Sequence, residues 1–191
     1  FPPSPLGTQL KTVAEMIAVR GTLQASRQIF FVATGGFDSH DDQAQDQPGL
    51  LANVSACLDA FYRATVEMGI AQSVTAFTQS DFGRTLTSNG DGTDHAWGGV
   101  QLVVGGAVHG KSVYGSYPVL RLGATLAADG ADDVGGGRFI PTTSSDQYAA
   151  TLARWFGVLD ADLARIAPGI DNFTQRDLGF TGEGDEGAVG A

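Results

Sequence analysis

Acidic and imidazole side chains follow the ends of two apolar segments of this chain. Residues 28–34 (QIFFVAT) lead through a double glycine into Asp38-Ser39-His40, and residues 73–78 (SVTAFT) lead into Ser80-Asp81-Phe82-Gly83-Arg84. A third cluster, Asp94-His95-Ala96-Trp97, comes shortly afterwards. Carboxylates and imidazoles bind divalent metals and transfer protons in catalysis. The pattern predicts a metal or acid–base site beyond the carboxyl ends of two strands, where open α/β sheets bind their ligands.

Two of these clusters each allow a functional and a plain structural interpretation. Asp38 and His40 lie two residues apart, so in an extended chain their side chains point the same way and could share one metal ion. The alternative is a solvated acidic loop, because two more aspartates follow directly. Asp81 is either a metal ligand or a turn-capping residue paired with Arg84. Because a guanidinium binds phosphate or sulfate through two parallel hydrogen bonds, Arg84 is also a candidate anion-binding residue.

The third cluster adds one more candidate ligand. Asp94 and His95 are neighbours, and neighbours in an extended chain point in opposite directions, so one of the two is expected to bind the metal and the other to orient it. Trp97 either shields the site from water or packs as an ordinary side chain. His109 is interpreted as a surface turn residue without a role. Cys57, the only cysteine, lies in an apolar helical pattern and is interpreted as a core residue, so cysteine usage does not identify the compartment.

Helices and strands must position these residues. The apolar spacing predicts a helix over residues 8–25, with Thr8 as its candidate N-cap, and a second, strongly amphipathic helix from Pro48 to Gly69. The uniformly apolar runs at 29–34 and 74–78 predict buried parallel strands. The second helix would join these two strands by a right-handed crossover.

The second half of the chain is richer in glycine. Its composition predicts a loop over residues 85–99, followed by a short strand over 101–106. Ser144 and Gln147 have the spacing of a capping box, which predicts that a helix begins there. A further short helix is expected over residues 160–166.

The charge balance restricts the partners. The 191 residues contain 11 Lys+Arg and 21 Asp+Glu, a net charge of -10 at pH 7. This argues against nucleic acid or an anionic membrane surface as the main partner. An anionic substrate would need a local cation or a metal to overcome the repulsion. No apolar run reaches the roughly 18 residues that a membrane span needs.

Three motifs in this order resemble those of the bacterial domain of unknown function 1501 family, which is grouped with the alkaline phosphatase and sulfatase superfamily. They are FVATGGFDSH at 31–40, SDFGRT at 80–85 and DHAWG at 94–98. The resemblance implies an α/β fold with a doubly wound, mostly parallel sheet and helices on both faces, of which residues 1–180 would form the C-terminal portion. Residues 181–191, rich in glycine and acidic side chains, are expected to form a mobile tail.

The resemblance also implies a divalent metal: zinc, calcium, magnesium or manganese. The expected ligands are Asp38, His40, Asp81 and His95. Arg84 would bind the anionic group and Asp94 would orient a ligand. Phe82 stands where the superfamily has a histidine, which argues against a complete two-zinc site. The nucleophile of that superfamily lies in an N-terminal half to which nothing in this chain corresponds.

The chain is therefore expected to be a portion of a metal-dependent phosphatase- or sulfatase-like hydrolase that acts on an anionic small-molecule or polymer ester. The alternative is a non-catalytic exported binding or assembly subunit that retains the fold with a degenerate site. A third interpretation takes the 191 residues as a complete, small α/β binding domain. The resemblance implies a periplasmic or secreted location. The missing N-terminal half, or a partner chain, is expected to cover apolar sheet surface.

Overall fold

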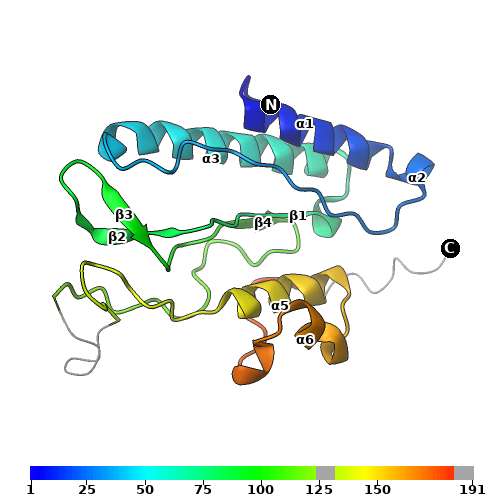
Figure 1. Cartoon of the computed structure of the whole chain (residues 1–191). Coiled ribbons are helices and arrows are strands. Elements are labelled where there is room, and N and C mark those ends of the chain that lie inside the picture. Colours follow the sequence, from blue (N-terminus) through cyan, green and yellow to red (C-terminus); the bar gives the residue numbers. More distant parts are fainter. Residues whose placement is uncertain (124–131, 183–191) are drawn as a thin grey trace.

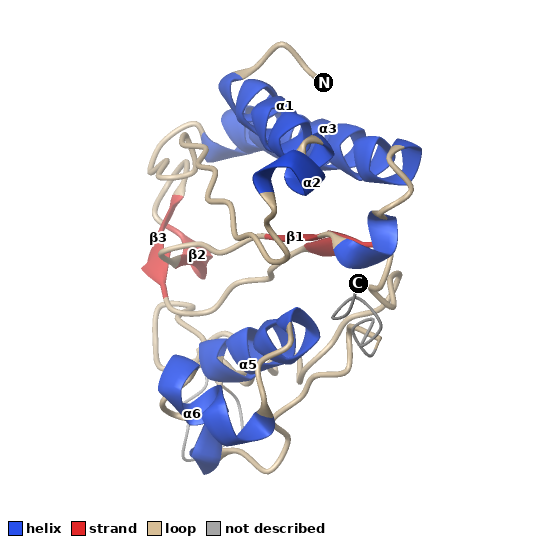
Figure 2. Ribbon diagram, turned by 90° about the vertical axis from the view of Figure 1, so that its right-hand side faces the viewer, coloured by secondary structure: helices blue, strands red, loops and turns tan. Residues whose placement is uncertain are grey.

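The computed structural model describes residues 1–123 and 132–182. Helices and strands form three layers (Figure 1). Helices α1 (Pro5–Ala18) and α3 (Gln43–Glu67) lie on one side, short strands lie in the middle, and α5 (Ser145–Phe156) lies on the other side. Figure 2 shows the same arrangement from a second direction. The mixture of helix and strand that the sequence predicts is confirmed.

The first helix begins earlier than predicted. Ser4 is its N-cap, because the Ser4 side chain accepts a hydrogen bond of 3.1 Å from the N–H of Gly7, and Pro5 occupies the first helical position. The prediction that Thr8 caps this helix is therefore wrong. A separate short helix, α2 (Arg20–Leu23), follows. The apolar side chains predicted to form the inner face are buried: Leu10, Val13, Ala14 and Ile17.

Helix α3 also begins earlier than predicted, so that Pro48 lies inside it. Its end is as predicted: Gly69 follows the last turn with a φ of 69°, a left-handed conformation that glycine adopts easily. The N–H of Gly69 donates to the carbonyl of Val66, and the next N–H donates to the carbonyl of Thr65. This pair of hydrogen bonds is a Schellman motif.

Two hydrophobic clusters stabilise the fold. The first joins α1 to α3 and includes Cys57, which is fully buried as predicted. The second lies between α5 and α6 (Leu163–Ile166) and includes Ala150 and Ile170. Tyr148 of α5 donates a hydrogen bond of 3.1 Å to the carbonyl of Thr78, which connects α5 to the segment that follows residue 77. Burial raises the pKa of the Tyr148 hydroxyl.

Residues 29–34 are not a strand, although the sequence predicts one there. Phe30 and Val32 pack against the first hydrophobic cluster, whereas Ile29 is 79% exposed and Phe31 is 91% exposed. Within the described residues, no hydrogen bond reaches the backbone of residues 29–32. With only one face covered, the buried strand and its parallel crossover do not form.

The strands that do form are paired in antiparallel fashion. β1 (Thr75–Phe77) pairs with β4 (Val103–Gly105), so strands are present where the sequence predicts them, at 74–78 and 101–106. The prediction that the first of these is a buried parallel strand is wrong, because β1 is antiparallel and only partly buried. β2 (Gly83–Ser88) pairs with β3 (Thr93–Ala96). The described strands therefore do not form the mostly parallel, doubly wound sheet that the family resemblance implies. No helix separates consecutive strands between residues 75 and 105, so the chain returns antiparallel rather than by a crossover.

The β2–β3 hairpin replaces most of the loop predicted over residues 85–99. Its turn contains Asn89-Gly90 and Asp91-Gly92, and Asn-Gly and Asp-Gly are the dipeptides that favour hairpin turns. The alternation along β2, with Gly83 and Thr85 buried and Arg84 half-buried, fits a strand with one covered face. These turn dipeptides favour a hairpin, whereas the glycine-rich composition of the same residues predicts a loop.

The C-terminal helices agree with prediction. Ser144 accepts a hydrogen bond of 3.1 Å from the N–H of Asp146, and its own N–H donates to the Gln147 side chain at 3.0 Å, which completes the capping box. A 3₁₀ turn at Asp160–Asp162 and α6 form the predicted short helix. Residues 183–191, most of the predicted tail, lie outside the described residues. In the described part of the chain, no helix combines the length and apolarity needed to cross a membrane.

We expect the purified protein to self-associate through the exposed side of residues 29–32, because an unpaired extended segment with large apolar side chains favours pairing with another chain. Replacement Phe31→Ser should shift the protein toward smaller species in light scattering. Replacement Leu159→Ser, at a position 71% exposed beyond α5, should not. A monodisperse monomer of the unmodified protein would contradict this expectation.

Candidate metal centre

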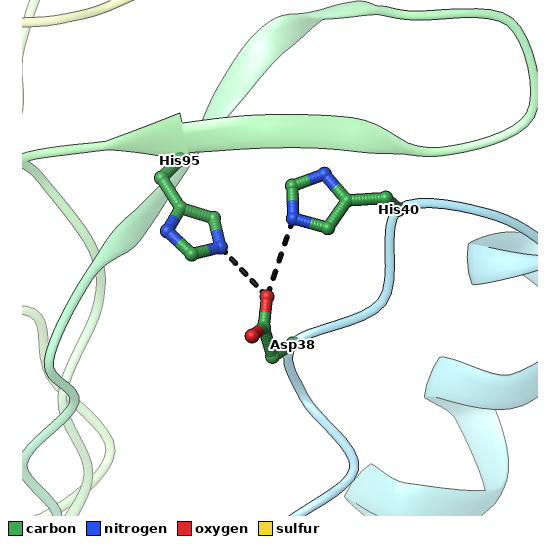
Figure 3. A group of neighbouring side chains, drawn as sticks. All are labelled: Asp38, His40 and His95. Carbon is green, nitrogen blue, oxygen red and sulfur yellow. Dashed lines mark hydrogen bonds and ion pairs between the residues drawn. The ribbon is translucent and has the colours of Figure 1, made fainter.

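Asp38, His40 and His95 meet at one end of the molecule, although they come from distant parts of the chain. Asp38 and His40 lie in the loop that precedes α3, and His95 lies on β3. Figure 3 shows both imidazoles directed at the Asp38 carboxylate. The Asp38 Oδ1 atom is 2.7 Å from His95 Nε2 and 3.3 Å from His40 Nε2. One ligand atom from each of the three residues lies within 4.8 Å of the others.

The three side chains form the single group of three or more such ligands that the described residues contain, and all three are exposed. Three of the four predicted metal ligands are therefore brought together. Asp81, the fourth, lies in an exposed bend and is not a member of the group.

Aromatic stacking fixes the rings of the two histidines. The rings of His40 and His95 have centroids 5.0 Å apart and an interplanar angle of 25°. On His95, the ring of Phe82 stacks with a centroid distance of 3.7 Å and an interplanar angle of 6°. Phe82 therefore stands where the family resemblance implies a metal-binding histidine, and its ring covers one face of the His95 imidazole.

Arg84 holds the loop and the hairpin together. Its guanidinium donates one hydrogen bond to the carbonyl of Thr93 at 2.6 Å and another to the carbonyl of Phe37. These carbonyls precede Asp94 and Asp38 in the sequence. The Arg84 Cζ atom also lies 5.1 Å from the centre of the Phe82 ring. The observed role of Arg84 is therefore to fix backbone, and its predicted role as an anion ligand stays a prediction.

The remaining predicted residues surround the cluster or lie apart from it. The Oδ1 atom of Asp94 is 3.7 Å from His40 Nδ1 and accepts a hydrogen bond of 3.0 Å from the Asn89 side chain, so Asp94 is placed to orient His40 rather than His95. Trp97 is largely exposed. His109 is exposed, and its Nδ1 atom is 3.3 Å from the carbonyl of Gly179.

The electrostatics of the cluster favour an ionised Asp38. The hydrogen bond to His95 is the main cause that lowers the pKa of Asp38 below its ordinary value. The charges of His95, His40 and Arg84 act in the same direction, and partial desolvation opposes them. A carboxylate that stays ionised to low pH is available as a metal ligand over a wide pH range.

The donor set fits a single, open metal site. On a tetrahedral zinc ion with bonds of ~2.0–2.1 Å, ligand atoms lie about 3.3 Å apart. The separation between His40 and Asp38 already has this value, 3.3 Å, whereas the shorter contact between His95 and Asp38 is a hydrogen bond. Two imidazoles and one carboxylate suit zinc or a similar transition metal better than calcium or magnesium. The exposure of the cluster leaves a coordination position accessible to a substrate or to water.

Sequence reasoning missed two parts of this site. Stacking of Phe82 on His95 depends on the hairpin that aligns β2 with β3, where Arg84 lies opposite His95. The Asn-Gly and Asp-Gly dipeptides of the turn were the available signal for that hairpin. The contact between Arg84 and the Phe37 carbonyl spans 47 residues and leaves no local pattern in the sequence.

A family model described as "Protein of unknown function (DUF1501)" matches residues 5–166, which include all of the candidate site. No curated protein and no solved structure matches the chain.

The contact between Asp38 and His95 can be tested by titration. Because the pKa of Asp38 is lower in the folded than in the unfolded protein, the contact contributes stability above the unfolded pKa of about 4, and this is lost as the pH falls through the folded pKa. In a side-chain carboxyl NMR titration, we expect the Asp38 midpoint to lie below that of an ordinary aspartate. It should rise in His95→Ala and stay unchanged in the distant control His109→Ala. An unchanged midpoint in His95→Ala would show that the contact does not form.

Proposed function

The chain belongs to the DUF1501 family, and we propose that it binds one divalent metal ion, preferably zinc. We propose further that it is a portion of a metal-dependent hydrolase of phosphate or sulfate esters. The observation that carries the proposal is the convergence of Asp38, His40 and His95. His95 and Asp38 are 57 residues apart in the sequence, yet their side-chain atoms are 2.7 Å apart. Two imidazoles and one carboxylate with an accessible face match the ligand set of catalytic metal sites.

The residues of the site have separate roles in this proposal. Asp38, His40 and His95 bind the metal, and Asp94 orients His40 through the Nδ1 atom that faces it. The metal, when bound, supplies a Lewis acid that polarises an oxygen of the ester. Arg84 supplies a fixed positive charge, close enough to Asp38 to contribute to lowering its pKa. In a chain of net charge -10, this local charge would attract an anionic ester.

The rest of the proposal depends on the family resemblance alone. By that resemblance, a portion outside this chain completes a doubly wound, alkaline phosphatase-like fold and supplies the nucleophile, and the protein is exported to the periplasm or secreted. The exposed side chains of Ile29 and Phe31 support the presence of a binding partner, because a chain that packs over this face of the segment would cover them.

The second candidate is a non-catalytic binding or assembly subunit that retains the fold. Two observations favour it. Phe82 occupies the place of the expected histidine, and its ring lies flat on His95. Asp81, the other residue carried over from the same motif, is not a member of the ligand group. With these two ligands absent, a two-metal site is not supported, and a structural or binding role for a single metal is the alternative.

Metal binding is tested by titrating the purified, metal-free protein with zinc chloride. We expect close to one equivalent to bind, and His40→Ala or His95→Ala to weaken binding by at least about 100-fold, because two protein ligands hold the metal poorly. His109→Ala is the matched control for loss of a histidine and Asp81→Asn for loss of a carboxylate, and both should bind as the unmodified protein does. Equal binding by all of these proteins would contradict the assignment.

Hydrolysis separates the two candidate functions. The intact native protein is assayed with aryl phosphate and aryl sulfate esters, before and after treatment with a chelator. The hydrolase proposal expects turnover that the chelator abolishes and zinc restores, and a loss of at least about 100-fold in His95→Ala. Zinc binding without turnover of either ester would favour the binding subunit instead.

A further inference from the structure

We propose that Phe82 and Arg84 are positioning residues that hold the metal ligands in place before any metal binds. This inference rests on the proposed metal site and goes beyond it, because it assigns the affinity of that site to two residues that are not ligands. Both side chains are half-buried, whereas Asp38, His40 and His95 are exposed. Exposed ligands lose side-chain freedom when they bind a metal, unless neighbouring groups have already fixed them.

Phe82 fixes the plane of His95. Its ring is 3.7 Å from the imidazole, centroid to centroid, and only 6° from parallel. An imidazole binds a metal through a lone pair that lies in the plane of its ring. Contact with the face of the ring therefore restricts its rotation and leaves the in-plane nitrogen free to point at Asp38. A phenyl ring does this without competing for the metal or for a proton.

Arg84 fixes the relative position of the two chain segments that carry the ligands. One arm of its guanidinium binds the carbonyl that precedes Asp38, and the other binds the carbonyl of Thr93, two residues before His95. The planar fork of arginine spans both acceptors at once, which the single ammonium group of a lysine does not. The contact between Arg84 and the Phe82 ring joins the two positioning residues into one unit.

This role makes a different prediction from the anion-binding role of Arg84. If Arg84 only binds an anion, Arg84→Lys should leave the zinc affinity unchanged, because lysine keeps the positive charge. A positioning residue would lower zinc affinity in Arg84→Lys, because the fork is lost. Groups outside the ligand set of a metal site contribute about 10- to 100-fold to metal affinity.

The experiment is calorimetric titration of the metal-free protein with zinc chloride. We expect Arg84→Lys and Phe82→Leu to bind zinc about 10- to 100-fold more weakly than the unmodified protein, and Phe82→Tyr, which keeps the stacking ring, to bind within a few-fold of it. The matched controls are Arg63→Lys, which alters an exposed pair with Asp59 on α3, and Phe77→Leu, which removes a ring contact with Tyr148. Both controls should bind zinc normally. Thermal unfolding of each variant verifies that it is folded.

A second measurement reports the stacking without a metal. In NMR spectra of the metal-free protein, the ring current of Phe82 should shift the His95 ring protons upfield. This shift should disappear in Phe82→Leu and persist in Phe77→Leu. Zinc affinity equal to that of the unmodified protein in both Arg84→Lys and Phe82→Leu would overturn this inference alone. Failure of the unmodified protein to bind zinc would overturn the proposed metal site, and this inference with it.

Discussion

The candidate site depends on the docking of the loop before α3 onto the β2–β3 hairpin. Arg84 binds carbonyls on both sides of this junction, and the side chain of Asp91 accepts the N–H of Asp42 at 3.0 Å. Gly92 permits the close approach, because a Cβ atom at that position would lie 2.0 Å from the carbonyl oxygen of His40. Without this junction, His95 would be separated from Asp38 and His40, and no ligand group would exist.

The sequence predicts those parts of the fold that depend on residues close together in the chain, and it fails where distant segments must interact. The end of α3 at Gly69, the Ser144 capping box and the burial of Cys57 follow from patterns a few residues long, and they are correctly predicted. The starts of α1 and α3 are not, because both helices begin earlier than their apolar spacing indicates. The buried strand predicted at 29–34 is wrong, because such a strand needs a hydrogen-bonded neighbour and a packed layer on each face. Within the described residues, the backbone of residues 29–32 has no hydrogen bond, and Ile29 and Phe31 are exposed. The loop predicted over 85–99 is a hairpin because its turn dipeptides override a glycine-rich composition.

The sequence likewise predicts only part of the candidate site. Residue types and their order identified Asp38, His40 and His95, and the structure brings the three together. The sequence also predicts Asp81 as a ligand, because it follows a strand and matches an aspartate of the superfamily motif, but it lies in an exposed bend outside the ligand group. What the sequence could not indicate is which side chains hold the ligands, since these contacts are made across the hairpin and the loop. Candidate metal ligands can thus be chosen by residue type, whereas the residues that contact and position them need three-dimensional information.

The proposed function requires that Asp38, His40 and His95 together bind one divalent metal ion. The most direct measurement is a crystal structure of the zinc-soaked protein, with diffraction data collected on both sides of the zinc absorption edge. Metal binding by these three residues predicts one strong anomalous peak about 2.0–2.2 Å from a nitrogen of each histidine and from an Asp38 oxygen. A peak located away from these three residues, or none at all under saturating zinc, would contradict it.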